Sequence, residues 1–526
     1  MTLSSENPII EKLQGVRFAD IEPHPFEIKK DQNSVTDIIG GNYSLAEKHM
    51  FDGLYFVAAD QCHLMARVRV PGGQLSSKQL REIGLIARDL TTGYIQITTR
   101  ANFQIRHLTG RNAFEMGQRL QAVGLHEIGD GANNVRNITA SPLAGVAVGE
   151  KIDVSPLIQE WAWQVTHDAD LKGLPRKFNV SFDGGGPVRL IEDTNDITVY
   201  AVGERSCDRF RIILGGDMSG DLGVEVDRIE LISVLTAIAR VYIVNKDRSQ
   251  RKKTRVKGVL DNWNLSSFLN EIESILGREL TKVKASIDIV QQAPPSRVGI
   301  IPHPQPGLNN LGVSLHMGSV TSEQLLTIAQ VADRFGSGEL RLTVWQNIII
   351  PNLASDSVLI ACSILNKAGL NTVQSNLRSG IIACTGSHHC QFSATDTKSH
   401  AIELADYLES RVELETPLNI HLTGCSNSCA QHYIGDIGLL ATRIKVGEST
   451  LPAYHVFVGG SFGKRHSLGR QLYRALPMEK LKLRLESMLK FYLAMKKERE
   501  TFQEFTARHE TDRLVVMFNV PRSLSS

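Results

Sequence analysis

The sequence predicts an α/β protein made of two fused, pseudo-symmetric halves. Three observations support this prediction: a long gapless internal repeat, a strand–helix–strand–strand pattern within each copy, and a further pair of similar segments after each copy. The chain has 526 residues, too many for one ordinary core, which suggests three or four domains or lobes. Its 42% hydrophobic and 22% charged residues are typical of globular proteins.

The internal repeat relates residues 68–108 to residues 313–353 at a constant offset of 245. Identical residues recur along its length, among them Gly73/Gly318, Ala87/Ala332, Gly93/Gly338 and Asn102/Asn347. Two unrelated domains are a poor explanation for so long a match without a gap. The copies also differ, because Arg100 in the first corresponds to Trp345 in the second. This divergence suggests that the two halves contribute different groups to one shared site.

Each copy has the pattern of a strand, a helix and two further strands. In the first copy an alternating strand around Val68 leads into a Gly turn, and a Ser or Thr N-cap opens an amphipathic helix over residues 77–90. Alternating strands follow at 94–98 and 103–108. Each copy is therefore expected to form mixed α/β packing.

The similarity continues, more weakly, beyond the repeat. A helix that ends in Gly-Leu follows each copy, at 120–125 and 365–370. Later each half has another alternating strand, KFNVSFDG at 177–184 and LNIHLTGC at 418–425. The C-terminal stretch 477–510 has helical apolar spacing and predicts one or two packed helices.

Charge and hydropathy exclude several classes of protein. No apolar run reaches the roughly 18 residues of a membrane helix, and the N-terminus lacks a secretory pattern, so we expect a cytoplasmic protein with no membrane contact. A net charge of +2 gives no signal for nucleic-acid binding. The exception is the basic segment 246–257, which is a solvated loop or a site for carboxylates, either on a cofactor or on an acidic partner.

Four of the seven cysteines gather within residues 384–429 as a C-x5-C pair and a C-x3-C pair. These are Cys384, Cys390, Cys425 and Cys429. An odd number of cysteines without an export signal argues against a disulfide framework.

Four thiolates suit zinc or an iron–sulfur cluster. The five-residue spacer fits a zinc knuckle poorly, and Gly- and Ser-rich loops let N–H groups approach cluster sulfurs, so a cluster is favoured. His388 and His389 are interpreted as loop residues rather than ligands.

Several segments together resemble the sirohaem- and [4Fe–4S]-containing nitrite and sulfite reductase family over nearly the whole chain. They occur in the family's order: TTRANFQIR at 98–106, NVRNITASPLAG at 134–145, LPRKFN at 174–179 and TGCSNSCAQHYIGDIGL at 423–439. The chain is most similar to ferredoxin-type assimilatory nitrite reductases. The resemblance implies that each half is a ferredoxin-like half-domain followed by an α/β domain that binds sirohaem or the cluster.

The resemblance also implies domain bounds. The expected parts are a lead-in over 1–60, half-domains over 61–110 and 296–355, a sirohaem- and substrate-binding domain over 111–295, and a cluster-binding domain with the C-terminal helices over 356–526.

Residue roles follow from the same resemblance. The four cysteines would hold a [4Fe–4S] cluster, and Cys429 would also ligate the sirohaem iron. Matches to the family's substrate pocket are Arg100, Arg136, Lys177 and Asn179. Matches to its contacts with sirohaem or the sirohaem carboxylates are Arg106, Arg176 and Asn427. Cationic side chains suit both a polyanionic cofactor and a small oxyanion substrate.

The substrate choice depends largely on Asn179. Where the family's sulfite reductases carry a second lysine in a K-x-K pattern, its nitrite reductases carry Asn, as in Lys177-Phe178-Asn179. A second lysine suits a dianion and Asn suits a monoanion. We therefore favour six-electron reduction of nitrite to ammonia, with reduction of sulfite to sulfide as the alternative. A non-enzymatic iron–sulfur electron carrier would have no need of the anion pocket.

Two departures from the family pattern concern the cluster loops. Ser426 replaces a usual Pro, and Ser387-His388-His389 replaces a segment with an Asn and an aromatic residue; neither change removes a ligand.

The Gly-rich segment 459–465 lacks the G-x-G-x-x-G spacing of a dinucleotide site. No flavin domain fits the remaining length, so the electron donor is expected to be a separate ferredoxin or flavoprotein. The basic segment 246–257 would serve either its docking or sirohaem binding.

Overall fold

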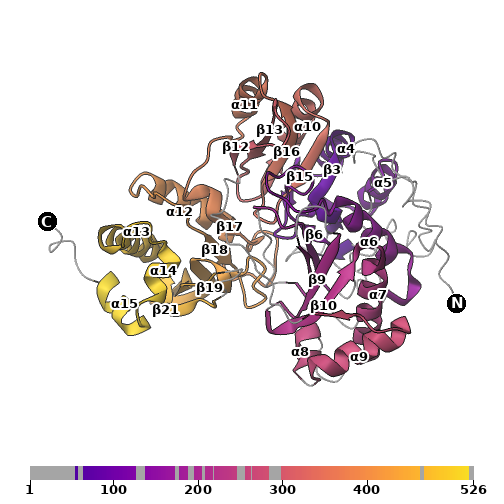
Figure 1. Ribbon diagram of the computed structural model, residues 1–526. Helices are drawn as coiled ribbons and strands as arrows, with labels where there is room; N and C mark the ends of the chain where they lie inside the picture. The colour runs from indigo at the N-terminus through magenta and orange to yellow at the C-terminus, as the bar shows by residue number, and fades with distance from the viewer. Residues whose placement is uncertain are drawn as a thin grey trace. The chain divides into compact units, whose positions relative to one another are not determined.

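The computed structural model describes residues 54–56, 63–125, 137–171, 174, 177–187, 195–203, 208–216, 218–245, 255–261, 263–283, 298–461 and 467–519. The chain forms two compact units (Figure 1), one built mainly from Cys62–Val313 and Ser319–Thr372, the other mainly from Val373–Ser526. Each unit has its own α/β sheet and its own apolar core. Within the described ranges, no helix is both long enough and apolar enough to span a membrane.

The two copies of the repeat lie in the first unit and exchange strands. β3 (Gln74–Ser76) of the first copy pairs with β15 (Glu339–Leu342) of the second. In return β14 (Ser319–Thr321) pairs with β4 (Tyr94–Ile97). The resulting antiparallel sheets have the orders β1-β2-β5-β4-β14 and β12-β13-β16-β15-β3. The exchange joins the copies into one symmetric body.

The other strands of these two sheets are β1 (Leu54–Phe56), β2 (Leu64–Val68), β5 (Phe103–Leu108), β12 (Gly299–Pro302), β13 (Leu308–Val313) and β16 (Ile348–Ala354). β4 and β5 confirm the two strands predicted for the first copy.

The predicted helix over 77–90 is confirmed as α4 (Ser77–Leu90), and its counterpart is α10 (Ser322–Phe335). Both begin with a capping box, in which Ser76 or Thr321 accepts from the backbone N–H of a Gln three residues later and that Gln side chain accepts in return. The two helices pack against each other (Figure 1). The helices that follow them are α5 (Gly110–Gln121) and α11 (Val358–Lys367).

The first unit also contains a six-stranded sheet in the order β11-β10-β9-β8-β7-β6. Its strands are β6 (Thr139–Ala140), β7 (Val180–Asp183), β8 (Ile197–Val202), β9 (Arg209–Leu214), β10 (Asp221–Asp227) and β11 (Thr281–Lys282). β6, β7 and β8 are parallel, and the rest continue antiparallel. The helices of this domain are α6 (Ser155–His167), α7 (Arg228–Val244), α8 (Val256–Leu260) and α9 (Leu265–Leu276).

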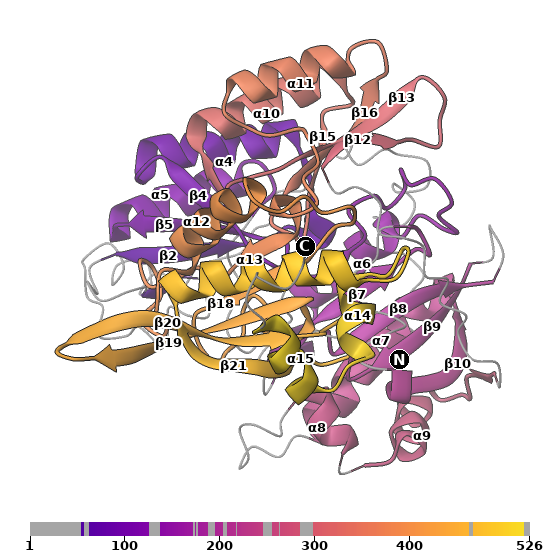
Figure 2. The same cartoon turned by 90° about the vertical axis from the view of Figure 1, so that its left-hand side faces the viewer.

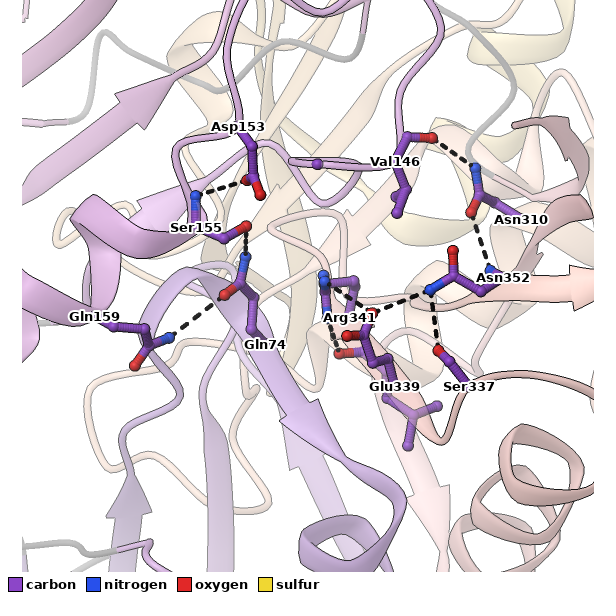
Figure 3. Close-up of polar contacts among 12 residues, drawn as sticks. Gln74, Val146, Asp153, Ser155, Gln159, Asn310, Ser337, Glu339, Arg341 and Asn352 are labelled. Carbon is purple, nitrogen blue, oxygen red and sulfur yellow. Dashed lines mark hydrogen bonds and ion pairs between the residues drawn. The ribbon is translucent and has the colours of Figure 1, made fainter. Parts of the chain in front are cut away.

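Polar contacts attach this domain to the repeat within the first unit (Figure 3). The Gln74 amide donates to Ser155 Oγ at the start of α6 at 2.7 Å. The Asn310 amide donates to the Val146 carbonyl at 3.0 Å, and Asn310 is fully buried. Because a buried amide without a partner is costly, these bonds fix the loop between β6 and α6 against the strands of the repeat.

The second unit has a five-stranded sheet in the order β17-β18-β19-β20-β21. Its strands are β17 (Ile381–Ala383), β18 (Ile420–Thr423), β19 (Ile437–Val446), β20 (Ser449–Val458) and β21 (Arg470–Pro477). The first three are parallel and the last two continue antiparallel, with α12 (Thr397–Glu409) between β17 and β18.

Helices complete the second unit at the C-terminal end. α13 (Met478–Met495) packs against β20 and β21, and the long β19–β20 hairpin extends beyond it (Figure 2). α13 and α14 (Phe502–Ala507) confirm the helices predicted for 477–510, and α15 (Thr511–Phe518) follows them.

Candidate functional site

Arg100 lies in a tight turn between β4 and β5. Thr98 Oγ1 accepts from the backbone N–H groups of Arg100 at 3.2 Å and Asn102 at 3.1 Å. The second copy has the same turn, in which Thr343 Oγ1 accepts from the N–H groups of Trp345 and Asn347 at the same two distances, 3.2 and 3.1 Å. The repeat therefore presents a half-buried cation in one copy and a buried indole in the other.

Neutral acceptors orient the Arg100 guanidinium. Its Nη2 donates to Asn195 Oδ1 at 2.8 Å and lies 3.3 Å from the Asn137 carbonyl. In return the Asn137 amide donates to the Arg100 carbonyl at 2.7 Å. Amide oxygens hold the guanidinium in place without cancelling its charge, so these contacts suit a cation that receives an anionic ligand.

Lys177 and Asn179 flank a core residue just before β7. Phe178 is fully buried and stacks on Tyr242 of α7 with ring centroids 5.3 Å apart. Successive residues of an extended chain point to opposite faces, so Lys177 and Asn179 share the other face. Lys177 is half-buried and Asn179 is 4% exposed. Phe178 therefore contributes to the core of the first unit.

Asp196, which the sequence did not single out, connects Asn179 to the basic segment. Its Oδ2 accepts from the Asn179 N–H at 2.9 Å. Its two carboxylate oxygens also accept from Arg255 Nε at 2.9 Å and Nη2 at 2.7 Å. In this bidentate pair the Asp196 side chain is buried, with 2% of its surface exposed. Arg255 belongs to the basic segment, whose residues 246–254 lie outside the described part of the chain.

The remaining cations predicted to contact sirohaem or substrate are less completely described. Arg106 on β5 is 5% exposed, and the amide oxygens of Gln96 and Gln104 accept from it at 3.3 and 2.6 Å. Arg136 and Arg176 lie outside the described residues. The roles given to these three side chains stay predictions.

The four cysteines follow two neighbouring parallel strands. Cys384 comes directly after β17, and Cys425 comes two residues after the end of β18. Because β17 and β18 run parallel, their carboxyl ends meet at one edge of the sheet. Cys429 is exposed and the other three cysteines are half-buried. The fold thus brings both predicted pairs to the same sheet edge.

Backbone N–H groups approach the cysteine sulfurs, as the Gly- and Ser-rich loops predict. The Gly424 N–H donates to Cys384 Sγ at 3.1 Å. Burial raises the pKa of the Cys425 thiol; the Asn427 N–H opposes this effect, and nearby Cys390 and Cys384 add to it. Cysteine sulfurs that lie near one another and accept N–H bonds fit an iron–sulfur cluster, whose sulfurs carry negative charge.

Side-chain hydroxyls hold the first cysteine loop in place. Thr397 Oγ1 donates to the Cys384 carbonyl at 2.9 Å. The buried Tyr454 hydroxyl lies 2.9 Å from Thr395 Oγ1 and 2.8 Å from His400 Nδ1. His388 is 70% exposed and pairs with Asp396 at 3.0 Å. In the described part of the chain, no three His, Cys, Asp or Glu side chains form a group that could hold a single metal ion.

A strained backbone presents the second cysteine pair. Ser428 and Gln431 have positive φ values of 53° and 56°, which few non-Gly residues adopt. The Ala430 N–H donates to Thr423 Oγ1 at 3.2 Å, which closes the loop back onto β18. Ser426 and Asn427 are exposed, as is Cys429 between the two strained residues. The loop therefore projects Cys429 away from the core.

Comparison with known families identifies the chain. The nitrite and sulphite reductase 4Fe-4S domain matches residues 131–280 and 374–515, and the nitrite/sulfite reductase ferredoxin-like half domain matches 58–123 and 301–365. The chain belongs to the nitrite and sulfite reductase family. The family's cofactors are sirohaem and a [4Fe–4S] cluster, and the cysteine loops fit the cluster.

The similarity to individual relatives covers most of the chain. It is 32% identical to ferredoxin–nitrite reductase of Synechococcus elongatus over 445 residues, which cover 82% of this chain and 86% of the relative. It is 29% identical to sulfite reductase [ferredoxin] 2 of Mycolicibacterium paratuberculosis over 467 residues, 86% and 83% of the two chains. The structure of the Mycobacterium tuberculosis NirA protein superposes with a TM-score of 0.84 at 26% identity, covering 93% of this chain and 95% of that one.

These similarities confirm an oxidoreductase with the predicted fold and cofactors. Asn195 and Asp196 were not predicted from the sequence as residues of the site. A signal was available, because Asn179 and Asp196 are separated by the same interval as Asn419 and Asp436 in the second half.

Proposed function

We propose that this chain reduces nitrite to ammonia, with electrons from a separate protein donor. The observation that supports nitrite is Asn179, buried two residues after Lys177, at the position where the resemblance places a second lysine in sulfite reductases. A single negative charge needs fewer cations than a double one. The similarity to ferredoxin–nitrite reductases agrees with this proposal.

The pocket residues bind and orient the substrate. Arg100 keeps its charge at any working pH and offers a planar donor edge to the two oxygens of nitrite. Lys177 can supply protons as the substrate oxygens leave as water, because its ammonium group is a positioned general acid. Arg136 and Asn179 complete the proposed pocket. When bound, sirohaem and the cluster supply the electron transfer itself.

The cysteine loops serve the cofactors. Cys384, Cys390, Cys425 and Cys429 hold the cluster, and Cys429 is also the proposed ligand of the sirohaem iron. Arg106, Arg176 and Asn427 are the proposed contacts of sirohaem or its carboxylates. We further propose ferredoxin as the donor, on the names of the relatives, with a flavoprotein as the alternative. A cytoplasmic location stays a prediction.

Sulfite is the second candidate substrate because one relative is named as a sulfite reductase. The experiment is turnover by the purified holoenzyme with reduced methyl viologen. We expect ammonia to form from nitrite at six reduced viologens per nitrite, and nitrite to shift the sirohaem absorption bands. A protein with a plain cluster spectrum and no turnover would instead be an electron carrier.

A further inference from the structure

The turn Asn195-Asp196, just before β8, accepts hydrogen bonds from two side chains and one backbone N–H of the first unit. Asn195 Oδ1 accepts from the Arg100 guanidinium at 2.8 Å. The Asp196 carboxylate accepts from the Asn179 N–H and from Arg255. Asn195 is 3% exposed and Asp196 2%, so both are shielded from water. Two adjacent buried residues therefore join two proposed pocket residues to the end of the basic segment.

Part of this arrangement recurs in the second unit. Asp436 Oδ2 accepts from the Asn419 N–H at 2.8 Å, as Asp196 accepts from Asn179 at 2.9 Å. The backbone bonds around each pair also correspond: Ile437 N–H to Asn419 O and Gly459 N–H to Asp436 O match Ile197 N–H to Asn179 O and Gly215 N–H to Asp196 O. The Asn–Asp clamp is thus a structural element of both sheets.

Two features of the first unit bear on function. The residue before the clamp aspartate is Asn195 in the first unit and Gly435 in the second. A Cβ on Gly435 would lie 2.9 Å from both a His421 ring atom and the Ile437 carbonyl, so a side chain does not fit there. The second feature is the bidentate bond from Arg255 to the clamp aspartate. Asn195 is therefore the residue that distinguishes the first clamp from the second.

We propose that Asn195-Asp196 is a positioning element of the anion pocket, in which Asn195 orients Arg100 and Asp196 offsets the charge of Arg255 beside Asn179. The inference rests on the proposed function. Asn195 holds the guanidinium through a neutral oxygen, which keeps its charge for the substrate. Asp196 holds Arg255 in a bidentate pair, which limits the net positive charge near the pocket and favours a monoanion over a dianion.

The main test is equilibrium titration of the oxidised holoenzyme with nitrite, followed through the sirohaem absorption bands. Asn195→Ala should weaken nitrite binding by about tenfold to a hundredfold, the scale of losing one hydrogen bond that involves a charged group. The control is Asp436→Asn, which alters the same clamp in the second unit and should leave the nitrite affinity unchanged. Thermal unfolding of all variants separates a lost fold from a lost contact.

Two opposite charge changes test Asp196. Asp196→Asn removes one negative charge beside Arg255, so the sulfite-to-nitrite ratio of kcat/KM should rise. Arg255→Gln leaves an unpaired carboxylate, so affinity for both anions should fall and the ratio should drop. A change in the same direction for both variants would overturn the charge argument.

The outcomes separate the two proposals. Nitrite affinity of Asn195→Ala equal to wild type, or an equal loss in Asp436→Asn, would overturn the positioning role and leave the proposed function standing. A wild-type protein that binds neither nitrite nor sulfite would overturn the proposed function first.

Discussion

The α/β sheets of the two units share one plan and carry different chemistry. In each, three parallel strands continue into antiparallel ones, a helix joins the first strand to the second, and an Asn–Asp clamp closes the turn before the third. The loop after the second strand of each sheet starts at a glycine, Gly184 or Gly424, where a Cβ would lie 2.3 Å from the Ile152 carbonyl or 1.9 Å from Ser393 Oγ.

The difference lies in the residues of the segments beside the first three strands. In the second sheet these segments hold the four cysteines, whereas the first sheet places Lys177, Asn179 and the Asn195-Asp196 turn around its second and third strands. The duplicated scaffold sets the position of its loops, and the residues on those loops set the chemistry.

The largest effect is expected from Cys384→Ser. Loss of a cluster ligand should remove most of the iron and acid-labile sulfide and cost more activity than the roughly tenfold to hundredfold of an outer contact. The control is Cys362→Ser, which changes a half-buried cysteine on α11 outside the motif. Equal iron contents in the two variants would contradict the assignment of the cysteine pairs.

Arg100→Ala should have the next largest effect. Removing one donor from an anion site costs about a hundredfold to a thousandfold in catalysis, and here the loss should appear mainly as a raised KM for nitrite. The matched variant is Trp345→Phe, at the corresponding turn of the second copy. It should leave nitrite kinetics near wild type. Both variants are compared by steady-state kinetics. If kcat/KM for nitrite fell equally in the two, the turn would serve only the fold.

The stability of the first unit should fall as pH rises, because of Glu150 in the loop after β6. Burial, assisted by Asp153 and Asp183, raises the pKa of Glu150 from 4.5 to about 9. The folded chain therefore keeps a proton that the unfolded chain releases above pH 4.5, and stability is lost by up to about 1.4 kcal/mol per pH unit up to that higher pKa.

Glu150→Gln removes this titration while keeping a neutral side chain. Relative to wild type, the variant should gain stability between pH 6 and pH 8 in thermal unfolding of the purified protein. The control is Glu115→Gln on α5, whose side chain is 51% exposed. A constant difference between wild type and Glu150→Gln at all pH values would show that Glu150 has the same pKa in the folded and unfolded chain, which contradicts the raised pKa.

His388→Ala should have the smallest effect. The His388–Asp396 pair is exposed on the His388 side, and such pairs contribute about 1 kcal/mol or less. Iron content should equal that of wild type, in contrast to Cys384→Ser. A loss of iron would make His388 a ligand and contradict its interpretation as a loop residue.

Local signals in the sequence predicted much of the fold. The helix caps at Ser76 and Thr321 and the turns at Thr98 and Thr343 depend on residues within four positions of one another. The cysteine pairs were likewise recognisable by spacing. The strand exchange between the copies was not predictable in this way, because β3 and β15 are distant in sequence and nothing in either strand specifies its partner.

The polar contacts around the site could not be predicted from the sequence either. Asp196 lies in the ordinary turn sequence DTND, and its partner Arg255 belongs to a segment that reads as a solvated loop. The raised pKa of Glu150 arises from burial among Asp153 and Asp183, and burial depends on packing that the sequence does not display. Contacts between distant residues define this part of the molecule.

The measurement that tests the central claim most directly is the ratio of kcat/KM for nitrite and for sulfite, determined for wild type and Asn179→Lys with reduced methyl viologen. The account predicts that wild type prefers nitrite and that Asn179→Lys moves the ratio toward sulfite, because a second cation suits a dianion. A wild-type preference for sulfite, or a ratio unchanged by Asn179→Lys, would contradict it.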